Sequence, residues 1–446
     1  MNQTQSKTGT NGAKIGTFSA LSIGIGGMVG GGIFAVTGLT VELTRGAAPI
    51  AFVVAGIVAL LTSYSYLKLT LRYPSEGGTV EFLNRGYGAG VITGSANILL
   101  CLSYIVLLAI YAYAFGSYGA SLFPESDYVF WKHALITGVI VFLSIVNFLG
   151  AQLVIRSENL FNGLKMVLLA IFVVIGLFTP LEWSRLSPDS YVSTIAIVSG
   201  AMIIFLNYEG FELIANAGKD VINPRRALPI AYIGGVIVVI ALYILISIVV
   251  VGHMDFGAIA KASDYALSAA ASTFMGRAGF IMIVIAALLA TTSAINATFY
   301  GSGRLTYIIA KYGELPRELE RTIRNQPLEG MIIFAVLTLI IANFIPLHSI
   351  ATMGSAGFLI IFMAVNIANF KLAKETKSKA WISLLAAFSC LIALAALCWQ
   401  TWRVLSTRSQ LWILAGMILS SLLIEIAYRA VTKRKMHMGH GRTPKS

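Results

Sequence analysis

The sequence predicts an all-α membrane protein that crosses the bilayer about twelve times. Hydrophobic residue types make up 57% of the 446 residues and charged types only 11%, whereas soluble domains carry about 25% charged residues. Long apolar runs, such as residues 230–251, match the roughly 20 residues that cross the ~30 Å hydrocarbon core. A membrane β-barrel is excluded, because its alternating segments of about ten residues would give a different pattern.

Each predicted span is an apolar segment between polar or basic stretches. Between the seventh and eighth spans, the amphipathic stretch 258–274 is expected to form an additional interfacial helix. The predicted spans, in chain order, are residues 15–43, 47–71, 91–122, 131–150, 158–178, 191–217, 228–252, 277–308, 330–345, 348–370, 381–401 and 409–430.

The formal net charge of +13 reflects how basic residues are distributed along the chain. With the N-terminus in the cytoplasm, 24 of the 32 Lys and Arg residues fall on the inner side and 7 on the outer side, leaving Lys165 inside the fifth span. This bias predicts a multi-pass protein of the plasma membrane with both termini cytoplasmic, and nucleic acid is not an expected partner. No cleavable signal peptide is expected, and the basic tail at 433–435 is expected to contact anionic lipid.

Enzymatic and metal-binding motifs are absent from the sequence. There is no GxSxG, HExxH or P-loop motif and no pair of histidine ligands. Cys101, Cys390 and Cys398 lie within apolar runs, so we expect buried free thiols rather than disulfides or ligands. The sequence therefore predicts neither an enzyme nor a cofactor.

Two spans have irregular centres. The first contains glycines at 24, 26, 27, 30, 31 and 32. One pair of small residues would fit close helix packing, but a dense cluster favours an unwound break, since glycine weakens a helix by about 1 kcal/mol relative to alanine. The sixth span contains the run 207–212 (NYEGFE), with two carboxylates and an amide in an otherwise apolar segment.

The two irregular centres indicate an internal repeat. Gly30 and Gly210 lie 180 residues apart, and because the second segment lies an odd number of spans, five, after the first, the second unit crosses the membrane in the opposite sense. This predicts a 5+5 inverted repeat with discontinuous helices 1 and 6. The predicted units are a tail (1–14), repeat 1 (15–178), repeat 2 (191–371), spans eleven and twelve (381–430) and a basic tail (431–446).

Broken helices create a site for a zwitterion. One half-helix begins with free N–H groups, which attract a carboxylate, and the other ends in free C=O groups, which attract an ammonium group or a metal cation. Irregular backbone at this depth is tolerated only where it lines a cavity. The sequence thus predicts an amino-acid site between the first and sixth spans.

Several motifs together resemble the amino acid–polyamine–organocation (APC) superfamily. They are residues 26–34 (GGMVGGGIF), 208–216 (YEGFELIAN), 223–224 (NP) and 296–315 (NATFYGSGRLTYIIAKYGEL). The similarity covers about residues 15–430, and the motifs most resemble those of the ApcT-like proton-coupled, broad-specificity amino-acid transporters. The resemblance implies the LeuT-type fold and alternating access.

The resemblance also implies roles for individual residues. The substrate carboxylate would be held by backbone amides of Gly30, Gly31 and Gly32, and the ammonium by carbonyls of Met28, Leu206 and Glu209. In ApcT-like members a lysine of the fifth span replaces the sodium ion of sodium-coupled relatives. Here that lysine is Lys165, with the Gly26 carbonyl and the Ser293 hydroxyl as partners and Thr292 adjacent. Tyr104 and Phe205 are expected pocket aromatics.

Lys165 and two acids are the unusual charged groups within the spans. Lys165 lies roughly 12 Å into the core, where a lysine costs at least ~2.5 kcal/mol. The alternatives are a side chain that snorkels to the inner face and an amine that carries the coupling proton. Glu212 either ties the sixth span to polar neighbours or is a second protonatable group. Glu209 sits at the break itself. It either contacts the substrate ammonium group or takes part in gating, or it faces water or has a hydrogen-bonded support role.

The expected pocket is small and apolar apart from these groups, which favours neutral amino acids such as alanine, serine or glycine. We therefore expect sodium-independent uptake by proton symport through alternating access. The alternatives are an amino-acid exchanger and a cationic amino-acid or polyamine transporter on the same fold. A membrane enzyme is disfavoured by the absent motifs, and a sensor is not expected because the two short predicted tails hold no soluble output domain. The oligomeric state is left open.

Overall fold

The computed structural model describes residues 14–150, 152–311, 313, 315 and 328–432. Within these residues the protein is a bundle of helices with two isolated β-bridges. Nine helical segments there are long and apolar enough to cross a membrane, two bent helix pairs qualify as broken spans, and α13 is a shorter apolar helix. This arrangement agrees with the predicted all-α fold of about twelve spans.

The unbroken spans are formed by long helices whose bounds lie close to the predicted ones. They are α3 (Ala48–Arg72), α5 (Val91–Ala120), α6 (Tyr128–Gly150), α7 (Gln152–Phe178), α10 (Gly235–His253), α12 (Ala266–Lys311), α13 (Leu328–Phe344), α14 (Leu347–Lys371), α16 (Ala380–Arg403) and α17 (Arg408–Thr432). The π-turn η6 (Ile230–Gly234) joins α9 (Pro224–Pro229) to α10. The cysteines are free thiols, with Cys101 and Cys390 buried as expected and Cys398 half-buried.

The first span is broken at its glycine cluster, as the sequence predicts. Helix α1 (Thr17–Met28) ends where Val29 leaves the helical conformation, and α2 (Gly32–Thr44) begins three residues later at a bend of 46°. Glycine is the residue that a helix accommodates least well apart from proline. The cluster therefore places the break near the middle of the span.

The sixth span is also broken, but its second half differs from a regular α-helix. Helix α8 (Thr194–Ile203) is followed by the 3₁₀ turn η4 (Phe205–Tyr208) and, after Gly210, by the 3₁₀ helix η5 (Phe211–Ala217). The two halves are bent by 49°. Gly210 has φ = 121°, a conformation that only glycine adopts readily, so it fixes the position of this break.

The prediction of one interfacial helix over 258–274 is wrong. The chain instead forms α11 (Phe256–Lys261), the 3₁₀ turn η7 (Ser263–Tyr265) and the first turns of α12, which kinks at Gly276 with φ = 61°. Asp255 caps α11 by accepting a hydrogen bond from the backbone N–H of Ala258 at 2.9 Å, and this bond lowers the pKa of its carboxyl. The break inside the predicted segment lies at Ala262, whose backbone angles (φ −103°, ψ 22°) leave the helical range between α11 and η7.

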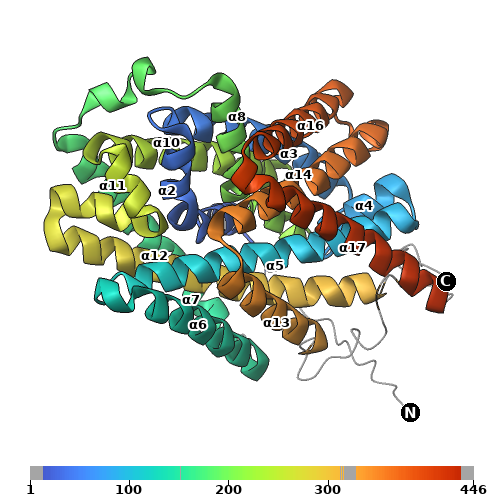
Figure 1. Ribbon diagram of the computed structural model, residues 1–446. Coiled ribbons are helices and arrows are strands. Elements are labelled where there is room, and N and C mark those ends of the chain that lie inside the picture. Colours follow the sequence, from blue (N-terminus) through green and yellow to red (C-terminus); the bar gives the residue numbers. More distant parts are fainter. Residues whose placement is uncertain (1–13, 151, 312, 314, 316–327, 433–446) are drawn as a thin grey trace, which may run out of the picture.

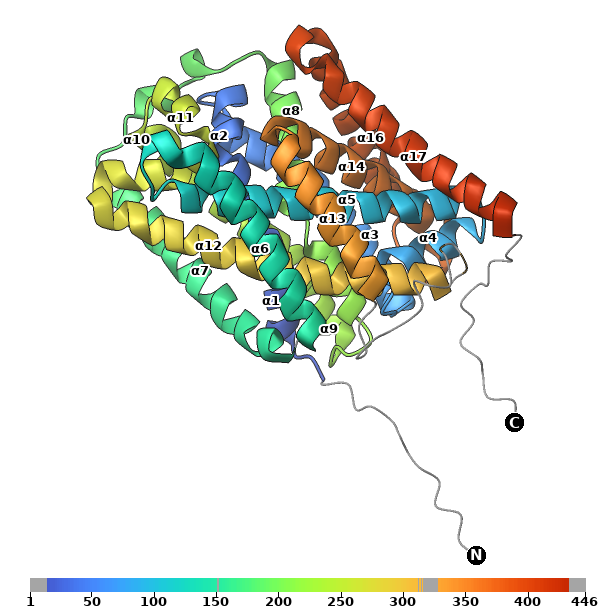
Figure 2. The same ribbon diagram turned by 60° about the horizontal axis from the view of Figure 1, so that its bottom comes forward.

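The broken spans lie inside a scaffold of long helices. Figure 1 shows α5 and α12 crossing the molecule side by side, with α6, α7 and α13 on one face and α16 and α17 on another. Helix α4 (Thr79–Tyr87) and α11 mark opposite ends of the bundle, here termed the α4 end and the α11 end (Figures 1 and 2). Because α1 packs on η5 and α2 packs on α8, the two breaks face each other at the centre.

Candidate functional site

The break in the first span leaves backbone carbonyls without helical donors. The last helical hydrogen bond of α1 runs from the N–H of Val29 to the carbonyl of Ile25 at 2.8 Å. The carbonyls that follow find side-chain donors instead: the Lys165 amine donates to Gly26 O at 3.0 Å, and the Tyr243 hydroxyl lies 2.6 Å from Met28 O. Two of the free carbonyls at the end of a helix are therefore satisfied by other spans.

Tyr243 also connects the two breaks to each other. Its hydroxyl lies 3.0 Å from the backbone oxygen of Asn207, in addition to its contact with Met28 O. The ring is fully buried and packs against Phe52 and Tyr208. Tyr243 was not predicted as a site residue. The available signal was weak, because Tyr243 is one of three hydroxyl-bearing residues in the seventh span, with Tyr232 and Ser247.

The backbones of the two broken spans come into direct contact at glycines. A Cβ atom on Gly27 would lie 2.8 Å from Gly210 Cα, and a Cβ atom on Gly210 would lie 2.5 Å from the backbone nitrogen of Met28. Both distances are too short for a real Cβ atom. The irregular centres can approach this closely only because neither position carries a side chain.

A cavity of about 100 Å³ lies against this contact. Such a volume holds several water molecules. Two further cavities border it, one sharing Tyr104, Leu213 and Thr298 and extending to Gly77 and Thr79 at the α4 end, the other sharing Ser22, Gly26 and Asn162. The central cavity is lined by Ser22, Ile23, Gly26, Gly27, Tyr104, Leu107, Tyr111, Asn162, Gly210, Glu212, Leu213, Ser293, Ala294, Ala297 and Thr298.

Glu212 forms part of the cavity wall and is fully hydrogen-bonded. One carboxylate oxygen accepts from the backbone N–H of Gly210 at 2.7 Å, and the other accepts from the Tyr104 hydroxyl at 3.1 Å. Tyr104 in turn packs edge-on against Phe358. The hydrogen bonds of Glu212 connect the break in the sixth span to α5. Because Glu212 also lines the cavity, its carboxylate has access to water there.

Glu209 has a different environment. Its side chain is fully buried, and neither carboxylate oxygen has a hydrogen-bond partner among the described residues. The described residues supply none of the hydrogen-bonded groups that the predicted support role would require. A buried carboxylate without a partner is unfavourable as an anion, so Glu209 is a group that requires either a proton or a cation.

Lys165 does not snorkel. Its side chain is fully buried, and its amine contacts Gly26 O at 3.0 Å, beside the cavity wall. Ser293 is on the same cavity wall, whereas Thr292 is half-buried. Thr291 donates back to the Ala287 carbonyl of its own helix at 2.7 Å, as expected for a threonine within a span.

The remaining predicted site residues gather at the breaks rather than on the cavity. Met28 and the three glycines of the motif are buried there with Leu206 and Glu209. Leu206 O accepts from the backbone N–H of Glu209 at 3.0 Å. Phe205 is fully buried against Phe362 and is not part of the cavity wall. Tyr111 and Asn162 line the cavity and were not predicted as site residues.

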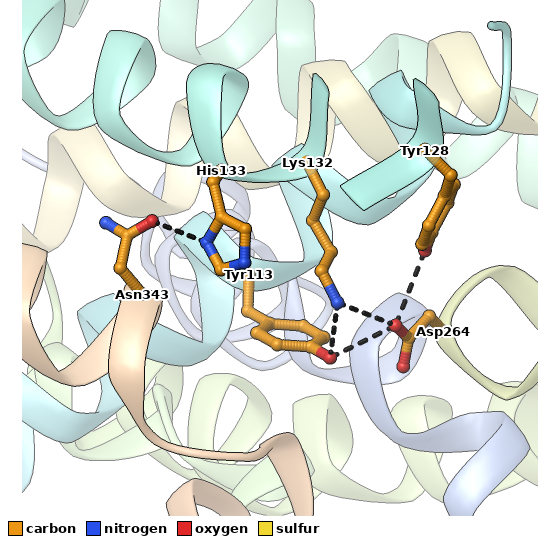
Figure 3. Close-up of polar contacts among 6 residues, drawn as sticks. All are labelled: Tyr113, Tyr128, Lys132, His133, Asp264 and Asn343. Atoms are coloured by element: carbon orange, nitrogen blue, oxygen red, sulfur yellow. Dashed lines mark hydrogen bonds and ion pairs between the residues drawn. The ribbon is translucent and has the colours of Figure 1, made fainter. Parts of the chain in front are cut away.

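At the α11 end, a polar cluster joins the segment after α11 to α5 and α6 (Figure 3). The Lys132 amine lies 3.4 Å from Asp264 Oδ2 and 3.1 Å from the Tyr113 hydroxyl. The hydroxyls of Tyr113 and Tyr128 donate to the same Asp264 oxygen at 3.0 and 3.4 Å. Next to Lys132, His133 contacts Asn343 of α13 at 2.9 Å.

This cluster fixes a segment that covers the first broken span. The turn η7, which contains Asp264, packs on α2. The contact is so close that a Cβ atom on Gly38 would lie 2.6 Å from Ser263 Cα. On the same side of the breaks Phe34, Tyr118 and Tyr208 are fully buried. The breaks are therefore covered towards the α11 end and border cavities towards the α4 end.

Asp264→Asn is expected to loosen this cover. Removing the charge weakens an ion pair whose side chains are 15% and 26% exposed, a contribution of about 1 kcal/mol or less. Amide hydrogen exchange across residues 256–265 should become up to about fivefold faster, as measured by mass spectrometry. Lys261→Met, a change at an exposed lysine of α11, is the control. Unchanged exchange in Asp264→Asn would show that the ion pair does not hold the segment.

Comparisons with known proteins place the whole bundle among transporters. Residues 15–423 match the family described as amino acid permease. The chain is 32% identical over 428 residues to the inner membrane transport protein YbaT of Escherichia coli, covering 95% of this chain and 99% of YbaT. It is 31% identical over 422 residues to an uncharacterized protein of Methanocaldococcus jannaschii, covering 94% and 96% of the two chains. The serine/threonine exchanger SteT of Bacillus subtilis is 26% identical over 320 residues, which are 69% of this chain and 71% of SteT.

Proposed function

This chain belongs to the amino acid permease family of the APC superfamily, so it is an amino-acid transporter with a LeuT-type fold and not an enzyme, and we propose that it takes up neutral amino acids by sodium-independent proton symport. The 5+5 inverted repeat then corresponds to residues 15–178 and 191–371, each half beginning with a broken span. The substrate site lies where the two breaks meet.

The observation that carries the proton-coupling proposal is the contact between Lys165 and Gly26 O. A charged amine at this position supplies one positive charge to the carbonyl end of α1, as a bound metal cation would. Loss of a proton leaves a neutral amine and removes that charge from the break. A buried ammonium group is costly unless partners such as the Gly26 carbonyl stabilise it. Binding of a proton to Lys165 is therefore coupled to the arrangement of the break. A fixed amine at this position also makes sodium unnecessary.

The substrate would bind as a zwitterion between the breaks. Its carboxylate would face the amides of Gly30, Gly31 and Gly32 at the start of α2, where the helix dipole is positive. Its ammonium group would face the carbonyls of Met28, Leu206 and Glu209, after Tyr243 has moved from Met28 O. Among the residues that line the cavity none is cationic, and Gly26, Gly27, Ala294 and Ala297 are small, which supports neutral amino acids of small or medium size as substrates.

Alternating access is supported by the unequal covering of the two ends. The cavities extend towards the α4 end, and the Lys132–Asp264 cluster covers the α11 end. The distribution of basic residues assigns the α4 end to the cytoplasm, so this conformation would face inward. A plasma-membrane location with cytoplasmic termini is part of the proposal. The predicted lipid contact at 433–435 lies outside the described residues, as does most of the N-terminal tail.

A cationic substrate is the second candidate, and Glu209 is the observation that favours it. A second ammonium group on the substrate would supply the partner that this buried carboxylate lacks. Cationic amino acid transporters of Arabidopsis thaliana are among the relatives, at 25–26% identity. An exchange mode on the same fold is a further alternative, which the similarity to SteT supports.

Uptake into proteoliposomes distinguishes these modes. Purified protein should accumulate labelled alanine, serine or glycine in sodium-free buffer when the outside is more acidic than the inside. Arginine and putrescine serve as cationic comparisons. Uptake that ignores the proton gradient and instead needs amino acid inside the vesicles would show exchange. Uptake that appears only when sodium is added would contradict the role proposed for Lys165.

A further inference from the structure

Asn207 is a buried amide whose side chain has no hydrogen-bond partner among the described residues. Its side chain is 1% exposed, and neither Nδ2 nor Oδ1 forms a hydrogen bond within the described part of the chain. Asparagines within spans usually join helices by hydrogen bonds, and Asn369 does so with Ser383 at 2.7 Å. Asn207 cannot have that role here. A buried polar group is costly unless something satisfies it.

The position of Asn207 indicates what would satisfy it. A Cβ atom on Gly32 would lie 2.5 Å from Asn207 Oδ1, so the amide rests directly against the first residue of α2. The first helical hydrogen bond there runs from the N–H of Ala35 to Gly31 O, and no side chain caps the helix. The amide thus lies at a helix start whose leading N–H groups attract anions.

The backbone of Asn207 is held while its side chain remains unpaired. Its carbonyl oxygen is 3.0 Å from the Tyr243 hydroxyl, and its N–H donates to Ile204 O at 3.0 Å. The bond to Ile204 O does not involve Tyr243, so it can hold the Asn207 backbone when Tyr243 leaves Met28 O. A donor carried on backbone held in this way loses less conformational freedom when a ligand arrives, which favours binding.

The geometry points to Asn207 as a substrate-binding residue whose side-chain amide donates a hydrogen bond to the substrate carboxylate at the start of α2. The inference rests on the proposed function and adds a sixth-span side chain to the backbone amides expected there. The amide nitrogen and oxygen are interchangeable by a flip of the side chain, so the donor can face a carboxylate held at Gly32. The substrate carboxylate thereby gains a neutral hydrogen-bond donor, the Asn207 amide, so the net charge of the site does not change.

Asn207→Ala separates binding from folding. The variant removes an unpaired buried amide, so the melting temperature of the substrate-free protein should not fall. Alanine binding, measured as the rise in melting temperature with alanine concentration, should weaken about tenfold or more, because a hydrogen bond to a charged group is lost. Asn207→Asp should weaken binding further at neutral pH by placing a carboxylate beside the substrate carboxylate.

Gly32→Ala supplies an independent readout through a double-mutant cycle. In the native background the new methyl group would displace the Asn207 amide, so alanine binding should weaken. In the Asn207→Ala background the same change should have a much smaller effect, because the atom it displaces is gone. Additive losses in the double variant would overturn the proposed contact between Asn207 and the helix start.

Two outcomes would overturn the proposal directly. One is an alanine affinity within twofold of the native value in Asn207→Ala, and the other is a lower melting temperature together with unchanged affinity, which would indicate packing alone. A native protein that binds arginine but not alanine would instead overturn the neutral-substrate proposal. Arginine carries the same carboxylate as alanine. The affinity of the Asn207 variants would then be measured with arginine, and the same two outcomes would overturn the proposal.

Discussion

Lys165→Ala is expected to abolish accumulation of alanine driven by a proton gradient. The change removes the buried amine that contacts Gly26 O at 3.0 Å and leaves this carbonyl without that donor. In proteoliposomes, uptake with the outside acidic should fall to the level measured without a gradient, a loss of at least ~100-fold in coupled rate if the amine carries the proton. Alanine binding should persist, since the amine does not contact the proposed substrate position.

Lys219→Ala is the matched control for this variant. Lys219 pairs with Glu76 at 2.7 Å, and both side chains are more than 40% exposed, so the pair contributes little. Gradient-driven uptake should remain within about twofold of the native rate. Full gradient-driven uptake by Lys165→Ala would contradict the assignment of the proton to this amine and would favour Glu209 or Glu212 as the coupling group.

Gly210→Ala is expected to destabilise the protein strongly and to eliminate transport. Residue 210 has φ = 121°, which strains any residue with a Cβ atom, and the added methyl group would lie 2.5 Å from Met28 N and 2.6 Å from Gly27 Cα. These are backbone atoms of the other broken span and cannot rotate away. The combined cost should be at least ~3 kcal/mol, seen as a lower melting temperature and a loss of alanine binding.

Gly138→Ala tests whether this effect is specific to the contact between the breaks. Gly138 lies within α6, and a Cβ atom there would meet nothing within 4 Å. Its substitution should leave the melting temperature unchanged or slightly raised, because alanine favours a helix more than glycine does. A Gly210→Ala protein as stable and active as Gly138→Ala would show that the two breaks do not touch in the working transporter.

The span count and both breaks were predictable because they depend on local composition. A membrane span requires an apolar run of a certain length, and glycine-rich centres such as 24–32 oppose helix formation wherever they occur. Lys165 was recognisable because charged residues are so scarce that a lysine within a span is conspicuous. These features need no knowledge of tertiary contacts.

The identity of the hydrogen-bond partners was not predictable in the same way. Tyr243 contacts Met28 O and Asn207 O across three spans, and nothing near position 243 in the chain indicates this. Likewise, the sequence left open whether Glu209 contacts the substrate or has a support role, and among the described residues its carboxylate has no hydrogen-bond partner. The division of 258–274 lies at Ala262, a residue type that favours a helix and gives no signal of a break.

Proton movement during transport tests proton symport directly. Proteoliposomes containing a pH-sensitive dye, sodium-free and with equal pH on both sides, would receive alanine from outside. Alanine entry is expected to acidify the interior, and this signal should be absent in Lys165→Ala. Alanine entry into vesicles of the native protein with no change of internal pH would contradict proton symport.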